Sequence, residues 1–223
     1  MLAHGREKQN HWWRQQLPSV KETSVEASMT SSQVIVIAGS MGAIPVIQQL
    51  LKGLPVTYPF PILICQHRGR SLPNLLPTVL GTGTKLRVKL AEVGEMIGKG
   101  TVYVAPAHAH LIINEKGCLE LIDGRKLKFL TSAAEPLFAS AAAVYGPRVV
   151  AIVLTGFGND AALGVQEVKE CGGTVIVQDE ATCEAFDMPK AVIKTGGVDQ
   201  VLSVSGIQEA LLKLTEDQTS HAG

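Results

Sequence analysis

The chain is poor in aromatic residues, cysteine and net charge, and it lacks long apolar runs. Of its 223 residues, 4% are aromatic and 4 are cysteines, and 20 Lys and Arg residues balance 20 Asp and Glu residues. No basic stripe is present, which argues against a general nucleic-acid-binding protein. No apolar run approaches the roughly 20 residues that span a bilayer, so we expect no membrane insertion.

The cysteines indicate neither a disulfide framework nor a metal site. Cys65, Cys118, Cys171 and Cys183 occur singly, without C-x-x-C or Cys/His ligand spacing. We therefore expect reduced, mostly buried thiols, no metal and no organic cofactor. His4 to Gln16 is polar and charged where a signal peptide would be apolar, so the sequence predicts a cytoplasmic protein.

Composition divides the chain into an arm, one domain and a tail. Residues 1–32 are rich in polar residues and predict a flexible N-terminal arm, although Trp12 and Trp13 leave a short docking helix as an alternative. Residues 33–215 have the pattern of one folded domain, and residues 216–223 are expected to form a C-terminal tail.

Short apolar runs alternate with segments of helical period from Gln33 onward. This pattern predicts an α/β fold, a doubly wound and mostly parallel sheet with flanking helices. A glycine between two short strands adds an antiparallel β-hairpin at Leu111 to Ile122. The predicted strands are Val34–Ala38, Ile62–Cys65, Val102–Ala105, Val149–Leu154 and Val175–Val177, and the predicted helices are Ile44–Leu51, Leu72–Leu80, Leu137–Tyr145, Leu163–Cys171 and Ile207–Leu214.

Ser40 follows the first predicted strand in a turn with small neighbours. The run Ala38-Gly39-Ser40-Met41-Gly42 partly matches the G-x-S-x-G nucleophile elbow, in which a serine hydroxyl stands exposed before a helix. A phosphate site at the helix N-terminus is an alternative. A dinucleotide site is a weaker one, because the G-x-G-x-x-G spacing fails.

The ends of two further strands supply a histidine and an aspartate. His67 follows the second strand, where it could reach a serine hydroxyl as a general base, with His108 and His110 in reserve. Asp160 follows Val149–Leu154; it is either a helix N-cap or the residue that orients the imidazole. The carboxyl ends of parallel strands share one sheet edge, so we expect Ser40, His67 and Asp160 to lie together.

Six segments, taken in order, resemble the catalytic domain of the CheB family of chemotaxis protein-glutamate methylesterases. They are Ile37-Ala38-Gly39-Ser40-Met41-Gly42, Cys65-Gln66-His67, Val102-Tyr103-Val104-Ala105-Pro106, Leu154-Thr155-Gly156-Phe157-Gly158-Asn159-Asp160, Gln178-Asp179-Glu180-Ala181-Thr182-Cys183 and Phe186-Asp187-Met188-Pro189. The family's triad falls on Ser40, His67 and Asp160.

The resemblance implies hydrolysis of γ-glutamyl methyl esters on chemoreceptors, with release of methanol, and glutamine deamidation at the same sites. A methyl-accepting chemoreceptor or a related methylated signalling protein is the implied partner. Met41, Gly42 and Phe157 are the expected oxyanion or substrate-binding residues.

Departures from the family pattern leave other functions open. Met41 replaces the usual threonine, Phe157 the usual methionine and Ala161 the usual glycine, and the stretch from Leu127 to Phe138 differs from the usual basic one. The same triad acting on another ester or amide, and a catalytically weak signalling or binding module, are the alternatives. Typical members carry a receiver domain before the catalytic domain, where this sequence has residues 1–32. We expect either a stand-alone esterase or a fragment.

Overall fold

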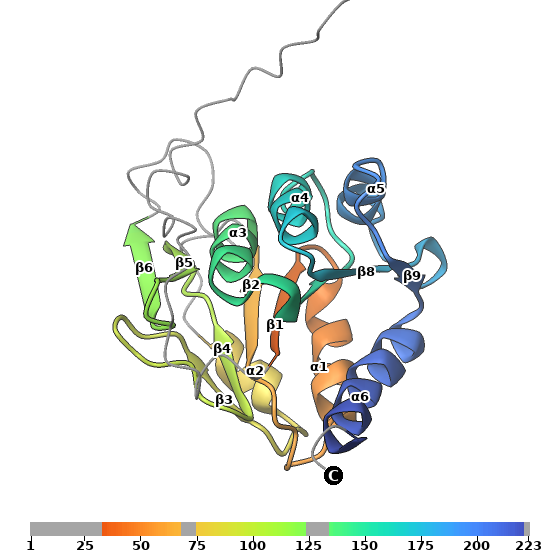
Figure 1. Ribbon diagram of the computed structural model, residues 1–223. Coiled ribbons are helices and arrows are strands. Elements are labelled where there is room, and N and C mark those ends of the chain that lie inside the picture. The colour runs from red at the N-terminus through yellow and green to blue at the C-terminus, as the bar shows by residue number, and fades with distance from the viewer. Residues whose placement is uncertain (1–32, 68–74, 124–133, 221–223) are drawn as a thin grey trace, which may run out of the picture.

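A parallel sheet of seven strands forms the centre of the fold (Figure 1). The computed structural model describes residues 33–67, 75–123 and 134–220. The strand order is β3-β4-β2-β1-β7-β8-β9, and every neighbouring pair is parallel. The strands are β1 (Val34–Gly39), β2 (Ile62–Gln66), β3 (Arg87–Leu90), β4 (Thr101–Val104), β7 (Val149–Val153), β8 (Thr174–Gln178) and β9 (Gln200–Leu202).

Helices cover both faces of this sheet, as the continuous apolar strands require. Along β1, Val34, Val36 and Ala38 face one cluster of buried side chains, and Ile35 and Ile37 face the other. One face carries α1 (Ala43–Gly53), α2 (Leu76–Gly81) and α6 (Val204–Ser220). The other carries α3 (Ala134–Tyr145), α4 (Ala162–Glu170), α5 (Asp187–Ile193) and a hairpin of β5 (Ala109–Ile113) and β6 (Leu119–Asp123). The predicted fold class is confirmed.

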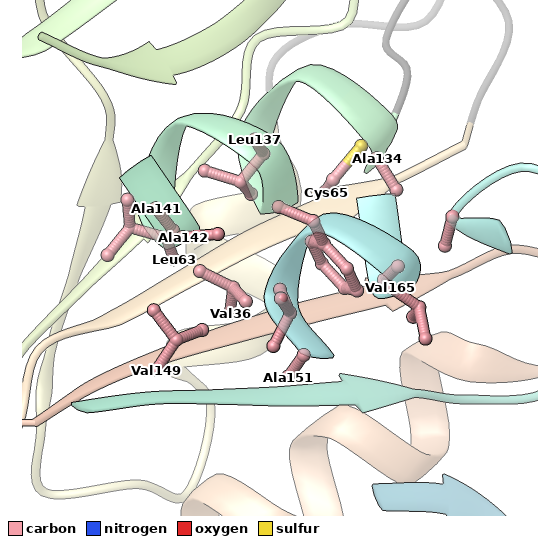
Figure 2. Close-up of a cluster of buried hydrophobic side chains, with 14 of the residues drawn as sticks. Val36, Leu63, Cys65, Ala134, Leu137, Ala141, Ala142, Val149, Ala151 and Val165 are labelled. Atoms are coloured by element: carbon pink, nitrogen blue, oxygen red, sulfur yellow. The ribbon is translucent and has the colours of Figure 1, made fainter. Parts of the chain in front are cut away.

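Small side chains let α3 lie close to the sheet. Ala141 and Ala142 pack above Val36 and Leu63, with Leu137 beside them (Figure 2). All five side chains are at most 1% exposed. This packing sets the position of the α3 N-terminus relative to the strand ends.

The edges of the sheet differ from the sequence prediction. Strands β3 and β9 and helix α5 were not predicted; β3 carries Arg87 and Lys89, and β9 has only three residues. Helix α6 continues to Ser220, beyond the predicted end at Leu214 and into the predicted tail. Two short 3₁₀ helices, Gly146–Arg148 and Glu180–Thr182, complete the described elements. The predicted arm, residues 1–32, and the start of the predicted helix Leu72–Leu80 lie outside the described residues.

The chain order reverses direction next to β1. After β1, the chain crosses one face through α1 to β2, whereas β7 lies on the other side of β1 and is followed by α4 on the opposite face. In open α/β sheets such a reversal is where ligands bind. The residues that follow β2, β1 and β7 therefore lie at this reversal. Within the described ranges, no helix has the length and apolar character needed to cross a membrane.

Candidate active site

Ser40 occupies the turn between β1 and α1. Its amide donates a hydrogen bond to the Thr155 carbonyl at 3.0 Å, and its own carbonyl accepts one from the Ala43 amide at 3.2 Å. Gly42 has φ +76°, a left-handed conformation that glycine adopts without steric penalty. A Cβ on Gly39 would lie 2.4 Å from the Cβ of Ala43. The small residues thus permit a tight turn that holds Ser40, half-buried, at the helix N-terminus.

His67 follows β2 and lies next to Ser40. The strand register pairs Gly39 with Gln66, and the His67 amide donates to the Gly39 carbonyl at 3.0 Å. The side-chain Nε2 of Gln66 donates to the Ser40 carbonyl at 2.7 Å and to the His67 carbonyl at 3.2 Å. Strand pairing and one buried glutamine therefore fix both residues at the same sheet edge.

Asp160 contacts the imidazole of His67. Its Oδ2 lies 2.5 Å from His67 Nε2 and accepts a second hydrogen bond from the Ala134 amide at 2.6 Å. The carboxyl side chain is 6% exposed and the imidazole 18% exposed. Ala134 opens α3, and the partial positive charge of a helix N-terminus favours an anion there. The reserve candidates are elsewhere: His110 is in β5, and His108 is an exposed residue just before it.

The alternative interpretation of Asp160, as the N-cap of α4, is wrong. The residue that precedes α4 is Ala161, and no local side chain caps this helix. Ala161 has φ +84°, the only positive φ of a described non-glycine residue, and such a conformation is strained. The backbone thus turns sharply after Asp160 and directs its carboxylate to His67 rather than to the helix that follows.

The contact with Asp160 occupies one imidazole nitrogen and determines which nitrogen is left for catalysis. A proton on Nε2 satisfies the carboxylate, so Nδ1 is the nitrogen left to accept a proton. Within the described residues, Ser40 Oγ and the imidazole form no direct hydrogen bond. Hydrogen bonds of this kind are often long without substrate and shorten in the reacting complex.

Three backbone amides beside Ser40 are free to bind a negatively charged oxygen. In the described part of the chain, the amides of Met41, Gly42 and Phe157 donate to no acceptor, whereas the Gly156 amide donates to the Ala185 carbonyl at 2.9 Å. The side chains of Met41 and Phe157 are 48% and 57% exposed. Of the predicted oxyanion and substrate residues, Met41 and Gly42 therefore lie in the turn that holds Ser40, and Phe157 lies in the segment after β7. The side chains of Met41 and Phe157 are open to solvent.

Thr155, which was not predicted as a site residue, connects the turn that holds Ser40 to the segment at Glu184 and Ala185 through hydrogen bonds. The buried hydroxyl of Thr155 lies 3.0 Å from the Met41 carbonyl and 3.1 Å from the Ala185 carbonyl, and it accepts from the amides of Glu184 and Ala185. Another buried glutamine, Gln178, accepts from the Thr155 amide through Oε1 at 2.9 Å. Gln66 and Gln178 each end an apolar strand. A polar residue at that position was the feature of the sequence that could have predicted these contacts.

Ionisable groups near the site differ in their expected charge. Burial, and then the negative charge of Asp160, raise the pKa of Glu135 from 4.5 to about 7. Burial raises the pKa of the Cys183 thiol to about 11, so this thiol stays protonated at neutral pH. None of the four cysteines, all of which lie in the described ranges, forms a disulfide. Among the described residues, no cluster of three or more His, Cys, Asp or Glu residues could hold a metal ion.

We expect Gly156→Ala to reduce catalysis at this site about 10²-fold or more. An added Cβ would lie 2.6 Å from the Cβ of Ser40 and 3.0 Å from its amide nitrogen, so the nucleophile would have to move. A misplacement of roughly 1 Å is enough to cause such a loss. The measurement is kcat/KM for ester hydrolysis, with circular dichroism to check folding.

Gly81→Ala is the matched control for that substitution. Gly81 ends α2, and an added Cβ there would have its nearest neighbour at 3.8 Å, an ordinary van der Waals contact. The control should keep wild-type kcat/KM. If a folded Gly156→Ala variant is equally active, Ser40 is not as tightly enclosed as the structure indicates.

Comparisons with known proteins agree with this geometry. The CheB methylesterase family model matches residues 35–211. The chain is 37% identical over 180 residues to the protein-glutamate methylesterase FrzG of Myxococcus xanthus, covering 81% of this chain and 54% of that protein. It is 40% identical over 185 residues to a protein-glutamate methylesterase/protein-glutamine glutaminase of Carboxydothermus hydrogenoformans, covering 80% of this chain and 54% of that protein.

A solved structure matches as well. The CheB methylesterase catalytic domain of Thermotoga maritima superimposes with a TM-score of 0.78 at 35% sequence identity, covering 82% of this chain and 99% of that domain. The chain spans about half the length of the two relatives described above. Since the family model covers most of the chain, and the strand-end residues that carried the resemblance gather at one sheet edge, the protein belongs to the CheB methylesterase family.

Proposed function

We propose that this chain is a serine hydrolase that demethylates γ-glutamyl methyl esters on a chemoreceptor or a related methylated signalling protein. The observation that carries the proposal is the 2.5 Å contact between His67 Nε2 and Asp160 Oδ2. The backbone amide of His67 also binds the carbonyl of Gly39, the last residue of β1 before Ser40. The names of the relatives supply the substrate class. Deamidation of glutamine, named for the Carboxydothermus relative, belongs to the proposal as a second activity.

In the first half of the reaction, Ser40 becomes acylated. Its Oγ attacks the ester carbonyl carbon while His67 Nδ1 accepts the hydroxyl proton, and Asp160 stabilises the imidazolium that forms. The carbonyl oxygen becomes an oxyanion, and the free amides of Met41, Gly42 and Phe157 are the donors available to it. When the tetrahedral intermediate collapses, the C–O bond to the methoxy group breaks and His67 returns its proton, so methanol leaves.

In the second half, water regenerates the enzyme. His67 takes a proton from a water molecule, whose oxygen attacks the acyl carbon. Collapse of this second intermediate breaks the bond to Ser40 Oγ, which recovers its proton from His67, and a free glutamate remains. For a glutamine substrate the same steps release ammonia. All of these steps use side chains and backbone amides of this chain, and the proposal includes no metal or organic cofactor.

Two apolar side chains favour a substrate that presents a methyl group from a protein surface. Met41 and Phe157 flank Ser40 and are about half exposed. Contact with a methyl ester and its surrounding helix would remove this apolar surface from water. The proposal further includes a cytoplasmic location, which four cysteines without a disulfide support because thiols persist in reducing compartments.

The test is methanol release from a carboxyl-methylated chemoreceptor fragment by the purified chain. We expect release from the fragment, with the new free glutamates located by mass spectrometry, at a kcat/KM at least tenfold above that for a small γ-glutamyl methyl ester. Remote binding contacts on the protein substrate are the reason for this preference. Hydrolysis of small esters alone would assign the triad to another substrate. A folded chain that binds the fragment without releasing methanol would be a binding module.

A further inference from the structure

One acidic side chain lies against the turn that holds Ser40. A Cβ on Gly42 would lie 2.6 Å from both the Cβ and the Oε2 atom of Glu184, and 3.1 Å from its Cδ. Because a carbon–carbon bond is about 1.5 Å long, Oε2 of Glu184 lies within about 4 Å of the Gly42 Cα. The Glu184 carboxylate is therefore next to the turn that carries the Met41 and Gly42 amides, which have no acceptor among the described residues.

The backbone fixes the point from which the Glu184 side chain extends. The amides of Glu184 and Ala185 donate to the Thr155 hydroxyl at 3.1 and 2.9 Å. The same hydroxyl lies 3.0 Å from the Met41 carbonyl, and the Gly156 amide donates to the Ala185 carbonyl at 2.9 Å. Glu184 therefore cannot leave the turn that holds Ser40 without breaking hydrogen bonds to a buried threonine.

The charge of the Glu184 carboxylate is not compensated by a neighbouring cation. Among the described residues, no Lys, Arg or His side chain forms an ion pair with it, and it accepts no hydrogen bond. The side chain is exposed, at the same end of α1 as Ser40. Its negative charge therefore acts on a ligand that enters the turn.

The substrate and the product of the proposed reaction respond differently to this charge. A γ-glutamyl methyl ester is neutral, whereas the free γ-glutamate that hydrolysis leaves is an anion at neutral pH. Free amides at the N-terminus of a helix, here α1, bind carboxylates, so the product would tend to stay in the site. A negative charge beside those amides opposes binding of the anion and has little effect on a neutral ester.

We propose that Glu184 is a specificity-determining residue, which disfavours carboxylate ligands at the amides of the Ser40 turn and so favours the neutral ester over its free glutamate product. The inference rests on the proposed function for the identity of this substrate and product, whereas the repulsion of an anion stands on the geometry. For two like charges a few ångströms apart at an exposed site, we expect an effect of about 3- to 10-fold on the affinity for the anion.

The test uses two small ligands that differ in this charge. N-acetylglutamate α-amide carries a γ-carboxylate, and its γ-methyl ester is neutral. Each is titrated into Ser40→Ala, which lacks the proposed nucleophile, and into the double variant that also carries Glu184→Gln. The readout is the nuclear magnetic resonance signals of the Met41, Gly42 and Phe157 amides. We expect Glu184→Gln to tighten binding of the carboxylate about 3- to 10-fold and to leave that of the ester within about twofold. At about 1 M salt, the difference for the carboxylate should shrink, because salt screens exposed charges.

Glu170→Gln in the Ser40→Ala protein is the matched control. It removes an exposed carboxylate from the opposite end of α4 from Asp160, and it should leave the affinities for both ligands unchanged. Since the Glu184 carboxylate has no hydrogen bond or ion pair in the described part of the chain, Glu184→Gln should fold. Glu184→Ala is a second variant with the same expected result.

Three results would overturn the proposal. The first is an equal affinity for the carboxylate with and without Glu184, and the second is an equal change for both ligands, which would indicate a steric effect. The third is a carboxylate that shifts none of the three amide signals after Glu184→Gln, because Glu184 would then not be what keeps the anion out. The proposed function fails separately, if the wild-type chain releases no methanol, and the binding result does not depend on that release.

Discussion

Ser40→Ala should abolish methanol release, with a fall in kcat of about 10⁴- to 10⁶-fold and little change in thermal stability. The substitution removes the hydroxyl that forms the acyl-enzyme in the proposed mechanism, and no other side chain of this turn is a nucleophile. The contacts that hold the turn are made by backbone atoms: the Ser40 amide binds Thr155, and its carbonyl binds Gln66 and Ala43. Alanine keeps all of them, so the fold and the position of the imidazole should survive.

The measurement is single-turnover and steady-state methanol release, with a thermal melt of each protein. Ser205→Ala is the matched control, because Ser205 is an exposed serine near the start of α6 and lies outside the site. The control should retain wild-type kcat. Binding of the methylated fragment to Ser40→Ala should remain within a few-fold of wild type, because the hydroxyl contributes mainly to the transition state. A variant with more than about a hundredth of wild-type kcat would exclude Ser40 as the nucleophile.

The central strands could be predicted from the sequence because their burial requires an unbroken run of apolar residues. A strand covered on both faces is apolar at every position, as Val34–Gly39 and Val149–Val153 are. Strands β3 and β9 lie at the two edges of the sheet and do not satisfy this condition, since their residues are partly exposed. Helix α5 has only seven residues and includes Pro189, so it gives no helical period to detect.

The meeting of the strand-end residues could also be predicted, but the groups that hold them could not. Parallel strands carry their carboxyl ends to one edge, so residues that follow β1, β2 and β7 are neighbours once those strands pair. The amide of Ala134 comes from a helix that follows the hairpin, 26 residues before Asp160. Likewise Thr155 and Gln178 are joined by a hydrogen bond across 23 residues. Contacts of this kind depend on tertiary packing and have no periodicity in the sequence.

Asp160→Asn should reduce kcat by about 10³- to 10⁴-fold with KM little changed. In the wild type, Oδ2 alone accepts from both His67 and Ala134. If the asparagine amide group turns its NH₂ to His67, Nε2 must become an acceptor and the proton moves to Nδ1, the nitrogen that should receive the serine proton. If it turns its oxygen to His67, the tautomer is kept but the negative charge that stabilises the imidazolium is lost. Either orientation weakens the transition state.

The matched control is Asp187→Asn, an exposed carboxylate in the first turn of α5, which should keep kcat within about twofold of wild type because an exposed charge contributes little. Retention of more than about a tenth of wild-type kcat by a folded Asp160→Asn variant would contradict an orienting role for Asp160.

The same variant separates the two causes that act on Glu135. Burial is the larger cause of its raised pKa and the negative charge of Asp160 the second, while the Leu163 amide opposes both. Removal of the Asp160 charge should therefore lower the pKa of Glu135 below about 7 but not return it to 4.5. A carboxyl-carbon titration of Glu135 in both proteins measures this. An unchanged midpoint in Asp160→Asn would show that burial alone sets the ionisation of Glu135, and that the two carboxyl groups are not coupled.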